Sequence, residues 1–272
     1  MVEQRIENPR VTSSTLVLGI LIINFLIMLK KKKINLPFLT KKLGYSLKNI
    51  RQTRSLGIAV SGGQDSISLL FNIFFLKSNY RISLIHCNHL WQENSTEKAS
   101  KLEMLAKQLK VPYFEATTSK KIQNEEQARL WRYKVISQIG TFHNYHHIFT
   151  GHTASDAIET KIRQLFLKAT RLKNNQKTPL RKRKILIILS PLKFKSRLET
   201  KNFCQKFKLP LQLDQTNNHF NLERNRIRRE FLPYIRYFLN RRIDENLYQI
   251  IKYGLGGYRT HGQSVKSRML YH

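Results

Sequence analysis

Cysteine and acidic residues are both scarce in this chain. Of 272 residues only two are cysteine, Cys87 and Cys204, and their spacing matches neither a CxxC pair nor a zinc site. A framework of disulfides is therefore excluded, and a reducing compartment is indicated. Aspartate and glutamate together number 17, against 49 lysines and arginines, so the formal net charge is +32.

That charge predicts a polyanionic partner. A strongly basic surface attracts polyanions over long range, and nucleic acid is the obvious one, because neutralising its phosphates releases condensed counterions. Composition offers a second explanation, since glycine numbers only 11 and lysine, asparagine, isoleucine and phenylalanine are common, as expected of an AT-rich genome. The two explanations are compatible.

The N-terminal apolar run is too short for a clear membrane span. Leu16–Leu29 is broken by Gly19 and Asn24 and falls below the roughly 20 residues that a spanning helix needs. It also lacks the basic start and the small-residue cleavage site of a signal peptide. We therefore expect either a true start at Met28, followed by the basic run Lys30–Lys33, or a marginal anchor, and no stable membrane association.

From residue 55 onward, short apolar runs alternate with stretches that have helical spacing. The expected strands are Leu56–Val60, Ile82–His86, Pro112–Glu115, Ile148–Thr150 and Ile185–Leu189. The expected helices are Asp65–Leu76, Glu97–Leu109, Glu125–Ile139, Asp156–Leu167, Arg197–Phe207 and Glu223–Leu239. Strands separated by helices of this length favour parallel βαβ units. The pattern predicts an α/β fold, a doubly wound parallel sheet with a small helical C-terminal extension.

Changes in composition divide the chain into four parts. We expect an N-terminal extension over 1–54, a catalytic domain over 55–190, a helical extension over 191–253 and a flexible tail over 254–272. Residues 168–184 are rich in lysine and arginine and contain no acidic residue. They are expected to form a loop that contacts nucleic-acid phosphates.

One hexapeptide, Ser-Gly-Gly-Gln-Asp-Ser, carries a specific chemical signal between an expected strand and an expected helix. Gly62 and Gly63 allow backbone N–H groups to approach phosphate, and the following helix offers a positive dipole end. Asp65 would repel phosphate unless it holds Mg²⁺, which bridges phosphate oxygens. The lysine of a Walker A loop is missing. The expected ATP-binding residues are Ser61, Gly62, Gly63, Gln64, Asp65 and Ser66.

This hexapeptide resembles the loop of the N-type ATP pyrophosphatases, the alternative being an ordinary helix N-cap turn. The resemblance implies a fold like that of the adenine nucleotide α-hydrolases. It also implies cleavage of ATP between the α and β phosphates, with transfer of AMP to a substrate oxygen. The superfamily includes GMP, asparagine and NAD synthetases, tRNA thiolases and tRNA(Ile)-lysidine synthetase, and the loop alone does not choose among them.

Four further segments distinguish among these enzymes. They are His86–His89, Glu125–Tyr133, Gly151–Thr160, and Asp214–Asn217 together with Arg224–Arg228. As an ordered set they resemble the motifs of the tRNA(Ile)-lysidine synthetases over about residues 55–240. The resemblance implies a ligase that joins L-lysine to the wobble cytidine of tRNA(Ile) with anticodon CAU. ATP would adenylate the C2 oxygen of the base, and the lysine amine would then displace AMP.

Spacing and resemblance together nominate the site residues. Asp156 and Glu159 share one helix face, where they complete a Mg²⁺ site, bind the ammonium groups of lysine, or merely complement the helix dipole. His152 is as readily a structural histidine as a catalytic one. The catalytic set is Asp65, Asp156, Glu159, His152 and Arg228, and the Mg²⁺ ligands are Asp65 and Asp156.

Arginine and tyrosine on two expected helices nominate the tRNA contacts, because arginine binds phosphate and tyrosine stacks on bases. The set is Arg129, Arg132, Tyr133, Arg224, Asn225, Arg226 and Arg228. Solvated helix faces are the alternative. The cluster Arg224–Arg229 lies near a helix start, where its charge opposes the dipole, so a bound phosphate or carboxylate would explain it.

The chain departs from the family pattern at three places. Ser155 stands where the family usually has the first of two adjacent aspartates, Lys168–Ala169 replaces an Arg-Gly pair, and we expect no counterpart of the C-terminal tRNA-binding domains of longer relatives. We expect a short form acting in the plastid, in the chloroplast stroma, or else in a bacterial cytoplasm. The rival predictions are a tRNA 2-thiolase, which would typically use a cysteine pair, and a catalytically dead RNA-binding relative.

Overall fold

The computed structural model describes residues 55–75, 81–91, 94–119, 122, 124–167, 186–193, 195–212, 223–239 and 243–253. The apolar run Leu16–Leu29, the basic loop 168–184, the segment Asp214–Asn217 and the tail 254–272 lie outside the described residues. Among the helices that are described, none is long and apolar enough to cross a membrane.

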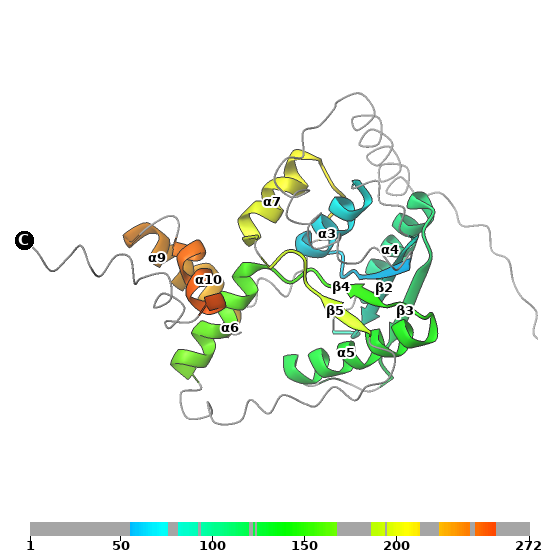
Figure 1. Cartoon of the computed structure of the whole chain (residues 1–272), viewed down its shortest axis with the longest axis horizontal. Coiled ribbons are helices and arrows are strands. Elements are labelled where there is room, and N and C mark those ends of the chain that lie inside the picture. The colour runs from blue at the N-terminus through cyan, green and yellow to red at the C-terminus, as the bar shows by residue number, and fades with distance from the viewer. Residues whose placement is uncertain are drawn as a thin grey trace, which may run out of the picture.

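Five parallel strands form the centre of the fold, in the order β3-β2-β1-β4-β5 (Figure 1). The strands are β1 (Ser55–Ala59), β2 (Arg81–Asn88), β3 (Tyr113–Thr117), β4 (His147–Phe149) and β5 (Ile187–Leu189). The central strand β1 pairs with β2 on one side and with β4 on the other. The chain forms β2 and β3 on one side of β1, and then crosses to the other side of β1 to form β4 and β5. The predicted doubly wound parallel sheet is confirmed.

Helices connect these strands and continue beyond them. They are α3 (Gln64–Phe75), α4 (Ser95–Leu109), α5 (Glu125–Phe142), α6 (Ala154–Leu167), α7 (Arg197–Lys206), α8 (Glu223–Arg226), the π-helical turn η3 (Ile227–Phe231), α9 (Leu232–Phe238) and α10 (Ile243–Tyr253). Strand β2 is longer than its apolar pattern predicts, because Cys87 and Asn88 continue the pairing with β3.

Both faces of the sheet are covered by helices (Figure 1). Leu56 and Ile58 of β1 point to the larger core, which they share with α3, α4 and α7. On the opposite face Ile85 and Ile148 pack against Ile136 of α5. Sheets covered on both faces have apolar strands without strict alternation, which is why the strands read as continuous apolar runs.

The last helices pack on α6 and not on the sheet. Ile158 and Ile162 of α6 form a small core with Leu232 of α9, lined also by residues of η3 and α10. The expected single helix Glu223–Leu239 is instead interrupted by η3. Pro233 has no N–H to donate to the carbonyl one turn earlier, and a π-helical turn just before it accommodates the missing bond. Helix α10 was not among the expected helices.

Gly151, which follows β4, lies against the beginning of α3. A Cβ atom on Gly151 would lie 2.9 Å from the backbone Cα and N of Ser66. Backbone atoms at this distance cannot give way as a flexible side chain can. The absence of a side chain at Gly151 therefore allows the end of β4 and the start of α3 to meet.

Substitution of this glycine should lower the stability of the whole domain. We predict that Gly151→Ala lowers the free energy of unfolding by roughly 1–3 kcal/mol, because the added methyl group forces backbone shifts. Gly63→Ala is the matched control, since its Cβ would meet only the Ser61 hydroxyl at 3.6 Å. Urea unfolding of both variants tests this, and equal stabilities would contradict the packing argument.

Candidate functional site

The segment Ser61–Ser66 forms the turn between β1 and α3, at the carboxyl edge of the sheet. The Ser61 N–H donates to Ser66 Oγ at 3.1 Å, and Ser66 Oγ donates to the Gly63 carbonyl at 3.0 Å. Gly62 has a φ of +79°, and a Cβ there would lie 2.4 Å from Gln212 Oε1. The turn is therefore closed on itself, and it brings the free N–H groups of the first turn of α3 to the sheet edge.

Asp65 is held by two residues of α7. Arg197 Nη1 donates to Asp65 Oδ2 at 2.9 Å, and Thr200 Oγ1 donates to Oδ1 at 2.5 Å. Burial raises the pKa of Asp65, Arg197 and Thr200 oppose that rise, and the charge of Asp156 adds to it. The net result is a pKa above the usual 3.8 of an aspartate, so the carboxylate lies in an environment that favours a bound cation.

Arg197 and Thr200 are functional candidates that the sequence analysis missed. They are more than 130 residues away from Asp65 along the chain, and no local pattern marks the pairing. The start of their helix was visible, because Ser196 and Glu199 form a capping box. Gln64 completes the link between α3 and α7, since Nε2 donates to the Arg197 carbonyl at 2.9 Å.

Asp156 and Glu159 of α6 form an acidic pocket that two arginines enter. Arg224 donates from Nε to Glu159 Oε2 and from Nη2 to Asp156 Oδ1, both at 2.8 Å. Arg228 donates from Nε and Nη2 to the two oxygens of Glu159 at 2.7 and 2.8 Å. Glu125 of α5 accepts a third bond from Arg224 at 2.5 Å. The side chain of Glu159 is 1% exposed and that of Asp156 is 14% exposed.

The arginine cluster therefore has carboxylate partners within the chain. The position of this cluster near a helix start predicted either a phosphate or a carboxylate beside it, and the structure contains carboxylates. Arg226 points elsewhere, because its side chain is 67% exposed and lies 3.6 Å from Glu230. Asn225 is buried. The expected tRNA-binding residues of this cluster thus have three different environments.

Opposing effects set the ionisation of Asp156. Burial alone would raise the pKa of its carboxyl, but the Thr153 N–H and the charges of Arg224, His152 and Arg228 outweigh burial and lower it below 3.8. The Thr153 N–H donates to Asp156 Oδ2 at 2.8 Å. Asp156 therefore remains charged at neutral pH.

The other expected contacts lie on α5 and after β4. The Cζ atom of Arg129 lies 5.1 Å from the centre of the Tyr133 ring. The Tyr133 and His152 rings are parallel within 5°, with centroids 6.5 Å apart. His152 Nδ1 is 3.0 Å from Thr150 Oγ1, and burial lowers the pKa of His152, so its ring is neutral at neutral pH. Within the described part of the chain, neither Arg129 nor Arg132 forms an ion pair.

Polar side chains at the end of β2 stabilise the conformation of the chain where it leaves the sheet. His86 Nδ1 lies 2.9 Å from the Val60 carbonyl, directly before the loop. Asn88 Nδ2 donates to Glu115 Oε1 at 3.2 Å, and its Oδ1 accepts the Leu90 N–H at 3.1 Å. His86 and Asn88 thus hold the sheet edge in shape.

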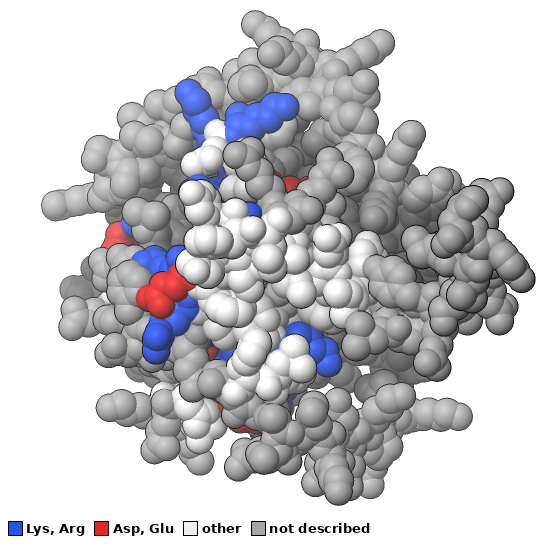
Figure 2. Space-filling view, turned by 90° about the vertical axis from the view of Figure 1, so that its left-hand side faces the viewer, with Lys and Arg blue, Asp and Glu red and all other residues white. Residues whose placement is uncertain are grey.

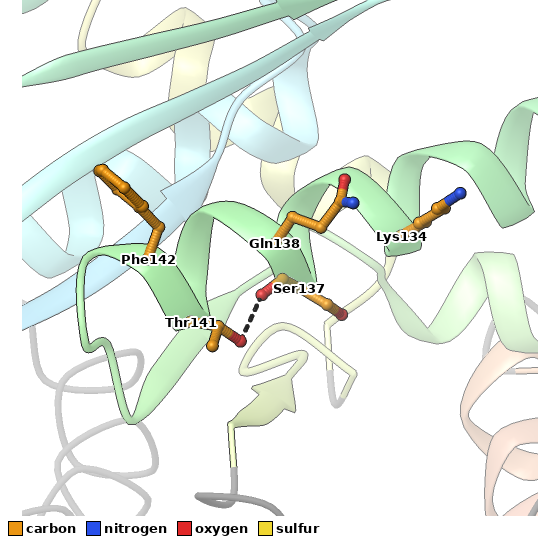
Figure 3. Close-up of a pocket in the computed structure, with 5 residues that line it drawn as sticks. All are labelled: Lys134, Ser137, Gln138, Thr141 and Phe142. Carbon is orange, nitrogen blue, oxygen red and sulfur yellow. Dashed lines mark hydrogen bonds between the residues drawn. The ribbon is translucent and has the colours of Figure 1, made fainter.

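Two surface features lie apart from this edge. A shallow hollow of about 490 Å³ follows the outer face of α5, with Thr141 Oγ1 bonded to the Ser137 carbonyl (Figure 3). Its lining residues are Lys134, Ser137, Gln138, Thr141 and Phe142. On the side of the molecule that carries α6, α9 and α10, the lysines and arginines that are described form separate groups around an uncharged area, and one group lies against acidic residues (Figure 2).

A family model described as a PP-loop domain matches residues 36–235, which is well over half of the chain. The chain therefore belongs to the PP-loop domain family. Its relatives include the chloroplastic tRNA(Ile)-lysidine synthase of Nephroselmis olivacea, 37% identical over 202 residues, which are 71% of this chain and 55% of the relative. The tRNA(Ile)-lysidine synthase of Nostoc sp. is 37% identical over 193 residues, 69% of this chain and 56% of the relative. The chain spans little more than half the length of these curated relatives.

A solved structure shares the fold. The U34-tRNA thiolase NcsA from Methanococcus maripaludis, determined with its [4Fe-4S] cluster, superposes with a TM-score of 0.62. The match covers 79% of this chain and 78% of the thiolase at 12% sequence identity. At this identity the likeness establishes the fold alone.

The ionised carboxylate of Asp156 makes a pH-dependent contribution to stability. Because its folded-state pKa lies below 3.8, the contribution is present above the unfolded value of about 3.9 and is lost as pH falls through the folded value. We predict that Asp156→Asn lowers the free energy of unfolding by roughly 1.5–3 kcal/mol at pH 7, as for a hydrogen bond to a charged group. The deficit should shrink below about pH 4.

Glu230→Gln is the matched control for this experiment. Glu230 pairs with Arg226 at 3.6 Å, but both side chains are more than half exposed. Such surface pairs contribute little, so the control should stay within about 0.5 kcal/mol of the wild type. Denaturant unfolding between pH 3 and pH 7 makes the comparison. A deficit in Asp156→Asn that is the same at every pH would contradict the assignment.

Proposed function

We propose that this chain is an ATP-dependent ligase that joins lysine to the wobble cytidine of tRNA(Ile) with anticodon CAU. The observation that carries the proposal is the acidic pocket of Asp156 and Glu159 beside the loop carboxylate Asp65, in a chain whose relatives are tRNA(Ile)-lysidine synthases. The site contains what the reaction needs, which is a phosphate loop, carboxylates for a cation or an amine, and unpaired arginines for RNA.

The reaction has two steps. The C2 oxygen of cytidine attacks the α phosphate of ATP, and pyrophosphate leaves. The lysine amine then attacks C2, the bond from C2 to the adenylated oxygen breaks, and AMP leaves. Adenylation is required because the unmodified oxygen is a poor leaving group. A nucleotide in an anticodon loop can reach the site without the opening of a duplex.

The loop supports the first step. An added Cβ at Gly63 would meet only the Ser61 hydroxyl at 3.6 Å, so this side of the turn is open to a ligand. The first N–H groups of α3 and the positive end of its dipole suit the phosphates. Arg197 lies beside Asp65 and adds a positive charge at the same place.

Asp65 and Asp156 fit a Mg²⁺ ion that also binds phosphate. Beyond the effect of burial, the charge of Asp156 contributes to the raised pKa of Asp65, so the two carboxylates interact. Mg²⁺ commonly takes one or two carboxylates together with substrate phosphates. Among the described residues there is no group of three or more His, Cys, Asp or Glu side chains that could hold a metal ion by themselves. When bound, the ion would supply positive charge to the departing pyrophosphate.

Residues of α6, α8 and η3, together with His152 just before α6, support the second step. Glu159 is enclosed by Arg224 and Arg228, whereas Asp156 is more exposed, so Asp156 is the carboxylate that can bind a cation, either Mg²⁺ or the ammonium group of lysine. The neutral His152 ring can accept the proton that the attacking amine loses. Arg228 lies beside Asp156 and orients the cytidine for attack by the lysine amine.

The tRNA contacts in this proposal come from two places. Arg129 and Arg132 of α5 have no ion-pair partner among the described residues, and Tyr133 offers a ring parallel to His152. Exposed Arg226 extends the basic surface beyond the acidic pocket. Phosphate contacts of this kind position an RNA without reading its sequence. Chloroplastic relatives are the basis for placing the enzyme in a plastid.

The cysteines disfavour the thiolase alternative. Cys87 packs with the core on the α5 side of the sheet, and Cys204 belongs to the core on the α3 side. Burial raises the pKa of Cys87 to about 11 and that of Cys204 to about 12. Both thiols are protonated at neutral pH and cannot pair, whereas cysteine chemistry requires the thiolate.

The Ser155 departure has a structural explanation. Ser155 Oγ accepts the Arg197 N–H at 3.0 Å and so satisfies a free donor in the first turn of α7. Serine therefore keeps α6 joined to the helix that carries Arg197 and Thr200. This contact weakens the case for a catalytically dead relative, because the helix that holds Asp65 stays in place.

The decisive assay combines the purified protein with ATP, radiolabelled lysine and candidate tRNAs. Lysine should be incorporated only into tRNA(Ile) with anticodon CAU, with release of AMP and pyrophosphate. Sulfur transfer, or tRNA binding without lysine incorporation under any tested condition, would refute the proposal.

Asp65→Asn should abolish pyrophosphate release while the fold remains intact. We expect a loss of about a hundred-fold or more, because charge stabilisation through a metal ion amounts to several kcal/mol. Thr200→Val is the control, since it removes one hydrogen bond to Asp65 but keeps the carboxylate. The measurement is tRNA-dependent ATP–pyrophosphate exchange. Wild-type exchange in Asp65→Asn would show that the carboxylate has no part in the chemistry.

Cysteine replacement separates the ligase from the thiolase. A variant with Cys87→Ser and Cys204→Ala should transfer lysine at a rate within about two-fold of the wild type, because neither thiol is a thiolate near pH 7. Because Cys204 is buried, the stability of the variant should be checked by thermal unfolding. If a stable variant has lost its activity, the proposed reaction is wrong.

A further inference from the structure

Three aromatic rings form a cluster where β2 leaves the sheet. The His89 ring lies between two indoles, with its centroid 5.6 Å from Trp91 and 4.9 Å from Trp131. Trp91 follows β2, and Trp131 lies on α5. Trp91 Nε1 donates to the Ile122 carbonyl at 3.1 Å, which anchors the indole at this edge. The cluster is thus built from two elements that border the candidate site.

This cluster is not part of the hydrophobic cores. The side chain of Trp91 is 46% exposed and that of neighbouring Leu90 is 52% exposed. The only polar atom of the Trp91 indole already has a partner, so what the ring offers outward is an apolar aromatic face. A large aromatic face held in place and left open is typical of a binding surface.

Charge and polarity at the cluster suit a nucleotide. Arg132 is on α5 with Trp131, lies close enough to His89 for its charge to act on that ring, and forms no ion pair with any described residue. Burial, and then the charge of Arg132, lowers the pKa of His89 to about 4, so the middle ring is neutral. Its Nδ1 is buried without a hydrogen-bond partner among the described residues. A buried nitrogen of this kind is uncommon in native structures and calls for an explanation.

We propose that Trp91, supported by His89 and Trp131, is a stacking platform for a base of single-stranded RNA, with Arg132 placed to meet that nucleotide's phosphate. Stacking on an aromatic ring accepts any base, and an arginine beside it neutralises the backbone. This inference rests on the proposed function, since the occupant would be a nucleotide near the modified one. Adenine of ATP has the same chemistry, but the platform is an exposed rim beyond the His86 contact to the loop, which favours RNA.

The two tryptophans give a direct signal for the platform. The whole chain contains only two tryptophans, and both belong to this cluster. Intrinsic tryptophan emission of the full-length protein therefore reports on this place alone. A seven-nucleotide single-stranded RNA should quench the emission, whereas an abasic oligonucleotide of the same length and charge should bind without comparable quenching. ATP with Mg²⁺ in the absence of RNA should leave the emission largely unchanged.

Affinity measurements with variants complete the test. Trp91→Leu should weaken binding of the RNA about ten-fold and leave binding of the abasic oligonucleotide unchanged, because stacking on one ring is lost. Trp91→Phe should restore most of the affinity, since it keeps an aromatic face. In Trp131→Phe the quenching should persist, because Trp91 is then the reporter.

Each outcome has a definite meaning. Equal affinity of wild type and Trp91→Leu for the RNA, or equal quenching by the abasic oligonucleotide, overturns the platform. Quenching by ATP alone overturns the RNA assignment. If the wild type transfers lysine and the platform test fails, only this inference is wrong. If RNA quenches as expected but no lysine is ever transferred, the proposed ligase activity is wrong and the platform stands.

Discussion

The hydrogen-bonded ion pairs that Glu159 forms with Arg224 and Arg228 are the constraint on which the site depends. Glu159 is almost fully enclosed, so its charge would be strongly destabilising without partners. Arg224 and Arg228 provide them from a segment more than 60 residues further along the chain. The same arginines reach Asp156 and Glu125, so one network joins α5, α6, α8 and η3. The position of the C-terminal helices and the lowered pKa of Asp156 therefore depend on the same two arginines.

A second connection joins the loop to α7, and the two meet at α6. Ser155 supports the start of α7, and α7 holds Asp65, while the neighbouring Asp156 belongs to the arginine network. Ser155 and Asp156 are adjacent on α6, but Ser155 contacts α7 whereas Asp156 contacts Arg224. This arrangement brings the loop carboxylate and the pocket carboxylates close together, although they come from helices that follow different strands.

The sheet could be predicted from sequence because buried parallel strands read as short apolar runs between helical stretches. Leu56 and Ile58 carry this signal, and so do the glycines of the loop, which a tight turn requires. Arg197 and Thr200 could not be predicted, because contact with Asp65 depends on tertiary packing and leaves no local pattern. The arginine cluster was recognised by its conflict with the helix dipole. The sequence did not determine whether a phosphate or a carboxylate balances the charge of this cluster, because that depends on which residues the fold brings beside it.

The π-helical turn η3 places the two arginines and Leu232 on faces that a regular helix would not bring together. One α-helical residue corresponds to a rotation of about 100°. If Ile227–Phe231 formed a regular α-helix with no residue removed, everything that follows would turn by about that angle, because a π-helical turn holds one more residue than an α-helical turn. Leu232 would then leave Ile158 and Ile162, the α6 residues with which it forms a core. The extra residue of this turn therefore sets the rotational phase of α9 and, with it, the contact between Leu232 and α6.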